Sequence, residues 1–286
     1  MISVIIPAYN ESKSIGKVVE TVQEILNENQ INNFEILVID DGSSDDTGNK
    51  AEESSAKVIK HPHNAGYGHS LKTGIMSASN DTIVIIDADL TYPVNAIPEL
   101  IRKYHEGFDM VVGARTGKYY RESIMKSLLR IILKFLVEFT AGRSIPDINS
   151  GLRVFSKKTI TNYLQHLCNT FSFTTSLTLA YMMTGKFVEY IPIEYGKRMG
   201  VSKVRLFRES LRTLQYITQS IIYYNPLKLF ILLSGLCFML SVLAFSITLF
   251  LNINLLYYVG IGGVFSSLII FCLGLLSDLL KQVVDK

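Results

Sequence analysis

Two long apolar segments near the end of the sequence limit the possible folds most strongly. Residues 229–251 and 253–277 contain no Asp, Glu, Lys or Arg. Each segment exceeds the ~20 residues that a helix needs to cross the hydrocarbon core of a bilayer. The alternative, two core helices of a large globular domain, would need more soluble sequence to cover them than the chain offers. We therefore predict two transmembrane helices.

The polar hinge between these segments is very short, so the two helices form a hairpin whose ends face the same compartment. The hinge, with Asn252 and Asn254, has no Lys or Arg, whereas Lys228 precedes the pair and Lys281 follows it. The positive-inside rule then places both termini in the cytoplasm. The opening MISVIIPAYN has no basic region and no cleavage site, which argues against a secretory signal. The first 225 residues are therefore expected to be cytoplasmic.

Charge and cysteine content exclude several classes of protein. The net charge of +3 and pI of about 8.6 are too weakly basic to indicate a nucleic-acid-binding protein. The three cysteines, Cys168, Cys237 and Cys272, are odd in number and show no paired spacing. This pattern argues against a disulfide framework or a zinc site, and favours small apolar side chains that fill space.

The first half of the chain alternates short β-branched runs with helix-like stretches, which predicts a mostly parallel sheet with helices on both faces. In such an α/β fold, ligands bind outside the carboxyl ends of the strands. The expected strands are Ile2–Ile6, Glu35–Ile39, Thr82–Ile86 and Asp109–Val112, and the expected helices are Lys13–Leu26, Asp46–Ala51, Gly68–Ala78 and Ile97–His105.

Acidic residues follow the third of these strands directly. Asp87 and Asp89, separated only by Ala88, can share a hard divalent cation through oxygen ligands. Such a cation would bridge a diphosphate and stabilise a departing nucleoside diphosphate. An isolated acidic pair of this kind usually caps a loop, so the other strand ends decide between the two interpretations.

Polar residues also follow the first two strands. Asp40-Asp41-Gly42-Ser43 offers a carboxylate to a nucleobase N–H, and Pro7–Glu11 offers a ring and a further acceptor. Asn64–Gly68 opens a helix with glycines that can bring backbone N–H groups near a phosphate. Taken singly, each segment is also ordinary turn sequence.

Two long helices are predicted between the sheet region and the apolar hairpin. Tyr119–Phe139 carries a row of charges at every fourth residue, and Lys203–Tyr223 separates a basic face from an apolar one. Either helix can lie in the membrane interface with its basic stripe among the headgroups. The alternative is a helix packed on its own domain with a solvated charged face.

Taken together and in order, the segments VIIPAYNE, VIDDGSSDDT, NAGYGHSLKTGI, IIDADLTYP and GAR resemble the family 2 glycosyltransferases, which have a Rossmann-like GT-A fold. PDINSGLRVF at 146–155 and the stretch 198–203 resemble one branch of that family, the polyprenyl-phosphate glycosyltransferases. Dolichyl-phosphate mannose synthase and bacterial enzymes that make undecaprenyl-phosphate sugars typify this branch. The resemblance covers most of the chain and is weakest over 116–145.

The resemblance implies roles for individual residues. Asp87 and Asp89 would hold Mg²⁺ or Mn²⁺ with the Ala88 backbone nearby, and Arg115 would face the phosphates. Arg198 and Lys203 would serve donor and acceptor phosphates, while the candidates for the acceptor phosphate are Arg121, Lys126 and Ser127. The nucleotide would be lined by Pro7, Tyr9, Glu11, Ile39 and Asp41.

This sequence departs from the family pattern at one metal-binding position. Some relatives have a Gln two residues past the second Asp, where this chain has Thr91. A hydroxyl can ligate the metal or hold a bound water.

The sequence also gives an indication of the acceptor. No Asp or Glu occurs between Asp147 and Glu189, a region where many relatives that glycosylate hydroxyl groups have an acidic residue. A phosphate acceptor needs no such general base.

We therefore expect a cytoplasmic catalytic domain at 1–202, a juxtamembrane amphipathic helix at 203–225 and a transmembrane hairpin at 226–286 in the inner membrane. The expected reaction is inverting transfer of a hexose or N-acetylhexosamine from a UDP- or GDP-linked sugar to a polyprenyl phosphate. The alternatives are transfer to a polysaccharide or lipid-linked oligosaccharide and, more remotely, a non-catalytic membrane module. A homo-oligomer stays an open alternative, and no nucleic acid is expected as a partner.

Overall fold

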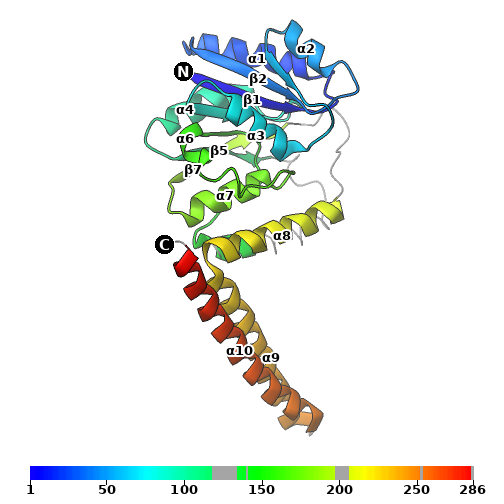
Figure 1. Cartoon of the computed structure of the whole chain (residues 1–286), viewed down its shortest axis with the longest axis vertical. Helices are drawn as coiled ribbons and strands as arrows, with labels where there is room; N and C mark the ends of the chain where they lie inside the picture. Colours follow the sequence, from blue (N-terminus) through cyan, green and yellow to red (C-terminus); the bar gives the residue numbers. More distant parts are fainter. Residues whose placement is uncertain (118–133, 140, 197–205, 252–253, 285–286) are drawn as a thin grey trace. The chain divides into compact units, whose positions relative to one another are not determined.

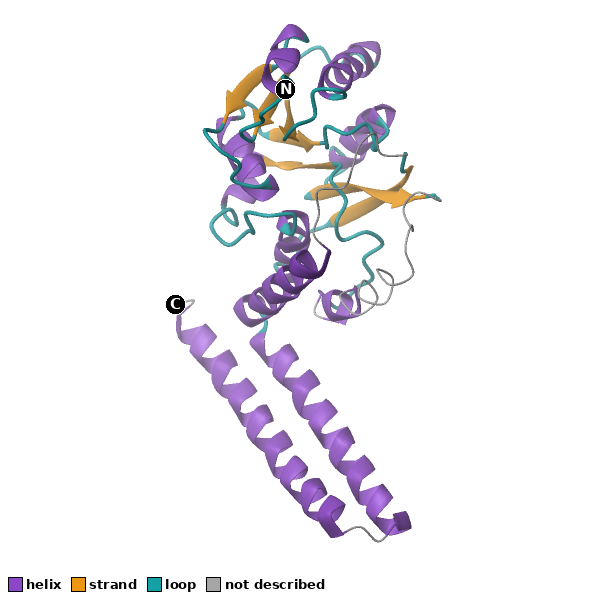
Figure 2. Ribbon diagram, turned by 90° about the vertical axis from the view of Figure 1, so that its right-hand side faces the viewer, coloured by secondary structure: helices purple, strands orange, loops and turns teal. Residues whose placement is uncertain are grey.

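The computed structural model describes residues 1–117, 134–139, 141–196, 206–251 and 254–284 (Figures 1 and 2). Within these ranges, seven strands form one sheet in the order β3-β2-β1-β4-β6-β5-β7. β6 runs antiparallel to β4 and β5, and the other neighbouring strands are parallel. The expected mostly parallel sheet is thus confirmed. The strands are β1 (Ile2–Ala8), β2 (Phe34–Asp40), β3 (Lys57–Lys60), β4 (Thr82–Ile85), β5 (Met110–Thr116), β6 (Arg153–Ser156) and β7 (Val188–Glu194).

Helices cover both faces of the sheet (Figure 2). Along β1, Val4 and Ile6 belong to one core cluster with the buried side chains of α1 and α4, while Ile5 faces α3 on the other side. A Cβ at Gly74 of α3 would lie 2.4 Å from Ile5, so only glycine allows this close approach. The helices are α1 (Ile15–Glu28), α2 (Thr47–Glu53), α3 (Tyr67–Ser77), α4 (Ile97–Tyr104), α6 (Lys157–Thr161) and α7 (Phe173–Met183), with a 3₁₀ turn, η1 (Val94–Ala96).

The sequence interpretation missed three strands and two helices, the short α6 and the longer α7. β3, β6 and β7 are short or carry polar residues, so they lack the continuous apolar run that marked the other strands. In α7, the residues from Phe173 to Met182 are buried, so the helix has no polar face that would reveal its period. It packs against the sheet on the same side as α3, through contacts that include Thr178 with Arg153 of β6.

The chain divides into two compact units, Met1–Tyr216 and Ile217–Lys286. The second unit contains the two apolar helices, α9 (Pro226–Leu251) and α10 (Asn254–Val284). Both are long and apolar enough to cross a membrane, and only 11% and 17% of their most apolar windows are buried within the protein. A core helix would be mostly covered, so this exposure agrees with the predicted hairpin.

Small residues bring α9 and α10 together. A Cβ at Gly263 would meet Ser241, and one at Gly274 would meet Phe230, so the two helices run antiparallel with glycines at their contact. Small residues at such contacts let helix backbones approach closely in lipid. Near the end of α10, the Lys281 ammonium group donates to the backbone carbonyl of Tyr224.

The two predicted amphipathic helices are only partly described. Residues 134–139 are helical, and α8 (Leu206–Tyr224) covers most of the second prediction. Residues 118–133 and 197–205 lie outside the described ranges, as do the side chains of 206–213. Placement of either helix in the membrane interface therefore stays a prediction.

Candidate functional site

The chain brings its polar strand ends to one edge of the sheet. The carboxyl ends of β1, β2, β4, β5 and β7 all lie at this edge, because these strands are parallel. β6 is antiparallel, so its beginning and the preceding residues 147–151 reach the same edge. Asp41, Asp87, Asp89, Arg115 and Asp147 therefore meet there, although they are distant in sequence.

Asp87 lies between a tyrosine hydroxyl and a glycine. The Tyr67 hydroxyl donates to Asp87 Oδ1 at 2.8 Å. Burial and, next, the negative charge of Asp87 raise the pKa of Tyr67 well above its ordinary value, so the phenol stays protonated and donates. On another side, a Cβ at Gly151 would lie 2.6 Å from Asp87 Oδ2 and 2.7 Å from Oδ1. Any side chain at position 151 would displace the carboxylate.

Asp89 is held by the turn that follows it. The Thr91 backbone amide and hydroxyl donate to Asp89 Oδ1 at 3.2 and 2.5 Å. Between them, Leu90 has a φ of 60°, in the left-handed region that costs a non-glycine residue roughly 1 kcal/mol or more. The Thr91 hydroxyl therefore orients Asp89, the second carboxylate of the pair.

Asp41 is buried at the end of β2 and accepts hydrogen bonds from three groups. The amides of Ala65 and Gly66 donate to its two oxygens at 2.9 and 2.8 Å, and His61 Nδ1 lies 2.8 Å from Oδ1. The glycine-containing segment expected near a phosphate therefore orders Asp41 in this structure. A Cβ at Gly68 would lie 2.4 Å from the carbonyl oxygen of Cys168, so this glycine lets the first turn of α3 pack closely against the loop at 168–170.

The loop after β1 is pinned to the loop after β2. The Asn10 amide donates to Ser43 Oγ at 2.9 Å, and the Glu11 amide donates to Thr47 Oγ1 at 2.8 Å. These bonds place Tyr9 and Glu11, both half-buried, beside the end of β2. Pro7 pairs in register with Ile39. Ile39 itself is fully buried beneath Gly74 of α3, so its side chain belongs to the core.

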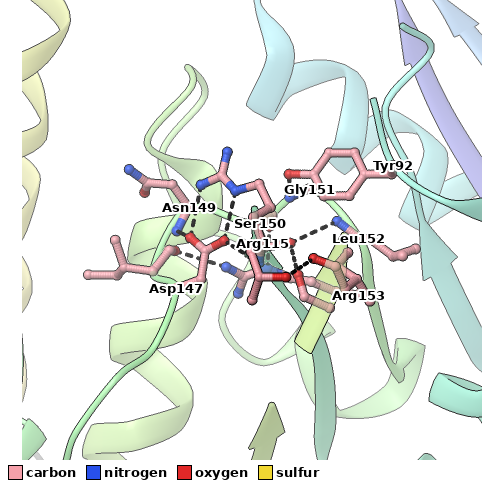
Figure 3. A network of polar contacts seen from close by, with 12 residues as sticks. Tyr92, Arg115, Asp147, Asn149, Ser150, Gly151, Leu152 and Arg153 are labelled. Atoms are coloured by element: carbon pink, nitrogen blue, oxygen red, sulfur yellow. Dashed lines mark hydrogen bonds and ion pairs between the residues drawn. The ribbon is translucent and has the colours of Figure 1, made fainter. Parts of the chain in front are cut away.

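Arg115, at the end of β5, forms a bidentate ion pair with Asp147 (Figure 3). Its Nε donates to Oδ2 at 2.7 Å and its Nη2 donates to Oδ1 at 2.8 Å. Burial acts to raise the pKa of Asp147, but the hydrogen bonds and charge of Arg115 outweigh it and hold the pKa below its ordinary value. The guanidinium also stacks over the Tyr195 ring, 5.4 Å from its centroid. These contacts fix the plane of the Arg115 guanidinium.

Arg153 holds the loop that carries Asp147 and Gly151 (Figure 3). Its side chain is fully buried, and Nε and Nη2 donate to the carbonyl oxygens of Ser150 and Ile148 at 2.8 and 2.9 Å. The Gly151 backbone amide donates a hydrogen bond to the Tyr92 hydroxyl at 2.7 Å. The PDINSGLRVF segment, which the sequence marked only as a branch signature, is therefore the loop that shapes the site.

Ala88, predicted to lie near the nucleotide, is buried in the core cluster. The remaining predicted site residues lie outside the described ranges, in residues 118–133 and 197–205. They are Arg121, Lys126, Ser127, Arg198 and Lys203. Their roles toward phosphates stay predictions. Tyr67, Gly151 and Arg153 were not predicted as site residues, although they lie in the segments NAGYGHSLKTGI and PDINSGLRVF that carry the family resemblance. Those two segments were the usable signal.

The donor atoms at residues 87 and 89 fit a hard divalent cation. Among the described residues, no group of three or more His, Cys, Asp or Glu side chains could hold a metal. Zn²⁺ sites usually use three or four such side chains, whereas Mg²⁺ is commonly bound by one or two carboxylates together with substrate phosphates and waters. Two carboxylates at a strand end therefore match Mg²⁺ or Mn²⁺ and a diphosphate.

Comparison with known protein families is consistent with a functional site at this edge of the sheet. The profile described as Glycosyl transferase family 2 matches residues 3–164, more than half of the chain. The chain belongs to glycosyl transferase family 2. The match includes β1 to β6, with Asp41, Asp87, Asp89, Arg115 and Asp147. As a member of this family, the protein is a glycosyltransferase.

Individual relatives place this family 2 member in the polyprenyl-phosphate branch. It is 31% identical over 253 residues to the undecaprenyl-phosphate 4-deoxy-4-formamido-L-arabinose transferase of Salmonella choleraesuis. The alignment covers 85% of this chain and 75% of the relative. The Salmonella newport enzyme of the same name matches equally. The resemblance seen in the sequence motifs is thereby confirmed.

Solved structures show the same fold. Glucosyl-3-phosphoglycerate synthase from Mycobacterium tuberculosis, in complex with Mn²⁺, UDP and phosphoglyceric acid, has a TM-score of 0.62 at 21% identity, over 77% of this chain and 78% of that one. The same enzyme with Mg²⁺ and UDP has a TM-score of 0.61 at 20% identity, over 77% and 79% of the two chains. These similarities confirm the expected GT-A fold.

Proposed function

We propose that this family 2 glycosyltransferase moves a sugar from a nucleotide-sugar to a polyprenyl phosphate, with inversion, at the cytoplasmic face of the inner membrane. The observation that carries the proposal is the meeting of Asp87 and Asp89 with the Arg115–Asp147 pair at the carboxyl edge of the sheet. The similarity to undecaprenyl-phosphate transferases supports the lipid acceptor, and the apolar hairpin supports its place at a membrane.

Asp87 and Asp89 would hold the Mg²⁺ or Mn²⁺, which would stabilise charge on the departing diphosphate. Tyr67 and Thr91 orient these carboxylates before the donor arrives. Arg115 presents a guanidinium of fixed plane to the phosphates, an arrangement that suits oxyanions.

The nucleotide would lie against the ends of β1 and β2. Asp41 there offers a carboxylate to a base N–H, while Pro7, Tyr9 and Glu11 come from the adjoining strand end. UDP and GDP are both compatible with such a carboxylate. The solved enzyme of the same fold was crystallised with UDP, which favours UDP as the first nucleotide to test.

The acids near the site support a phosphate acceptor. A hydroxyl acceptor needs a general base with a pKa near the operating pH. Asp147 is a poor base, because the ion pair with Arg115 holds its pKa below the ordinary value. α7 contributes no acid at all. A phosphate monoester is already anionic at neutral pH, so it attacks without losing a proton to the protein.

The expected test is synthesis of a lipid-linked sugar. Full-length protein in detergent, supplied with Mn²⁺, undecaprenyl phosphate and a panel of nucleotide-sugars, should yield an acid-labile sugar-phosphate lipid by mass spectrometry. The panel should contain hexose and N-acetylhexosamine donors, which we favour. It should also include a nucleotide-linked form of 4-deoxy-4-formamido-L-arabinose, the pentose-derived sugar named for the Salmonella enzymes.

Two controls give this assay its meaning. Undecaprenol, which lacks the phosphate, should not be glycosylated, because it presents a hydroxyl that requires a base. If polysaccharide or lipid-linked oligosaccharide is glycosylated while undecaprenyl phosphate is not, the acceptor assignment is wrong.

The placement of the termini is tested separately. Fusions of a reporter that is active only in the cytoplasm, made to either terminus, should be active if both ends are cytoplasmic.

Replacing Gly151 by Ala should impair the metal site while the fold persists. The added Cβ would lie 2.6–2.8 Å from the Asp87 carboxylate, so the carboxylate must move. Displacing an oriented ligand typically costs ~10–100-fold in metal affinity or activity. The measurement is the Mn²⁺ concentration that gives half-maximal transfer. Gly196→Ala is the matched control, because among the described residues its Cβ would meet nothing closer than 3.4 Å, and it should behave as wild type.

A further inference from the structure

One short loop contacts both of the carboxylates that the sequence assigned to different parts of the donor. Ala65 and Gly66 donate their amides to Asp41 at the end of β2, and the next residue, Tyr67, donates its hydroxyl to Asp87 after β4. The distance from Tyr67 Oη to Asp87 Oδ1 is 2.8 Å. Three consecutive residues thus join the carboxyl ends of two separate strands.

The position of the Tyr67 ring is fixed by a second loop. The ring stacks on Phe171 with centroids 5.7 Å apart and an angle of 15° between planes. Gly68 packs directly against the backbone of residues 168–170, and the His69 amide donates to the Asn169 carbonyl at 3.0 Å. The hydroxyl of Tyr67 is therefore held in place by contacts that do not involve Asp87.

The other side of the Asp87 carboxylate is closed by Gly151, whose missing side chain leaves just enough room for it. A carboxylate between a fixed donor and a fixed backbone has little freedom to rotate. Outer hydrogen-bond partners of metal-binding side chains set ligand orientation, and their loss typically weakens metal binding ~10–100-fold. Tyr67 has the geometry of such a partner.

We propose that Tyr67 is a positioning residue of the metal site, whose hydroxyl holds Asp87 in the orientation that binds the divalent cation. This inference rests on the proposed function, since it assumes that Asp87 is a metal ligand. The stacked Phe171 and the glycine at position 68 serve the same end, because they fix the ring that carries the hydroxyl.

The test is Mn²⁺ binding by Tyr67→Phe, which removes the hydroxyl and keeps the stacked ring. Free Mn²⁺ is counted by electron paramagnetic resonance, with the full-length protein saturated by UDP or GDP, whichever the wild type binds. The dissociation constant of Mn²⁺ should rise about 10–100-fold. Binding of the same nucleotide in EDTA should change less than about twofold, because the bonds to Asp41 come from backbone amides and persist.

Tyr163→Phe is the matched control, because it also removes a tyrosine hydroxyl bond, the one to Thr184 at 2.9 Å, away from this edge of the sheet. It should bind Mn²⁺ as the wild type does. Equal Mn²⁺ affinity in Tyr67→Phe and wild type would overturn the inference and leave the metal role of Asp87 intact. A matching loss of metal-free nucleotide binding would also overturn it, since the loop as a whole would then have collapsed. Failure of the wild type to bind Mn²⁺ would overturn both the inference and the metal role.

Discussion

Asp89→Asn is expected to lower sugar transfer by roughly 10³-fold, the range seen when one group that stabilises developing charge is removed. Asn keeps an oxygen that can accept from Thr91, whose amide and hydroxyl now donate to Asp89 Oδ1, so the turn after β4 should persist. What disappears is one negative charge of the metal-binding pair. The measurement is the turnover number with saturating donor and lipid acceptor across a range of Mn²⁺ concentrations.

Asp81→Asn provides the matched control for this variant. Asp81 precedes the same strand, β4, but lies at its opposite end, where its carboxylate accepts from Ser156 and Lys158. Its replacement should leave turnover within about twofold of wild type, because surface substitutions away from special features have small effects. Near-normal turnover of Asp89→Asn, in a protein that still unfolds cooperatively, would remove the metal role of this residue.

The arrangement of the sheet was predictable where local pattern and tertiary environment agree. β1, β2 and β4 are buried on both faces, so their apolar runs are continuous and their ends are sharp. β6 could not be predicted in this way. It lies in the interior of the sheet but begins with Arg153, and an arginine usually indicates a solvent-exposed position. Its guanidinium is accepted in the interior because carbonyl oxygens of the preceding loop bind it.

The site was predictable to the same extent. Asp87 and Asp89 were recognisable because polar residues follow several strands whose carboxyl ends meet at one edge of the sheet. Carboxylates gathered there are better explained by ligand binding than by loop capping. Tyr67 and Gly151 were not recognisable, since their roles arise from contacts between loops distant in sequence. A tyrosine in a helix-opening turn and a glycine before a strand both have ordinary local explanations. Only the folded structure shows that they lie on either side of one carboxylate.

Arg115→Met is expected to destabilise the catalytic unit by about 3–5 kcal/mol, because it leaves a buried carboxylate without its cation. The Asp147 side chain is 1% exposed, and after the substitution the donors left to it within the described part of the chain are the backbone amides of residues 115 and 149. Asp147→Asn should cost less, since Arg115 is 17% exposed and can be partly hydrated. Thermal unfolding of full-length protein in detergent should show Arg115→Met roughly 6–20 °C below wild type.

The double variant Arg115→Met/Asp147→Leu should regain most of this loss, because a buried pair can be replaced by apolar side chains at little cost. Lys103→Met is a control that removes an exposed ion pair of equal length, 2.7 Å to Glu106, and it should cost less than about 1 kcal/mol.

The destabilisation of Arg115→Met should also depend on pH. In the wild type, the pKa of Asp147 is lowered in the folded state. The pair therefore stabilises the fold above pH 3.8, the ordinary pKa of an aspartate, and this stabilisation is lost as pH falls through the lower pKa of the folded state. In Arg115→Met, burial without the cation favours the protonated acid. The difference in unfolding midpoint should therefore be largest near pH 7 and shrink toward pH 4. A difference that does not change with pH would mean that lost packing, and not the unpaired charge of Asp147, destabilises the variant.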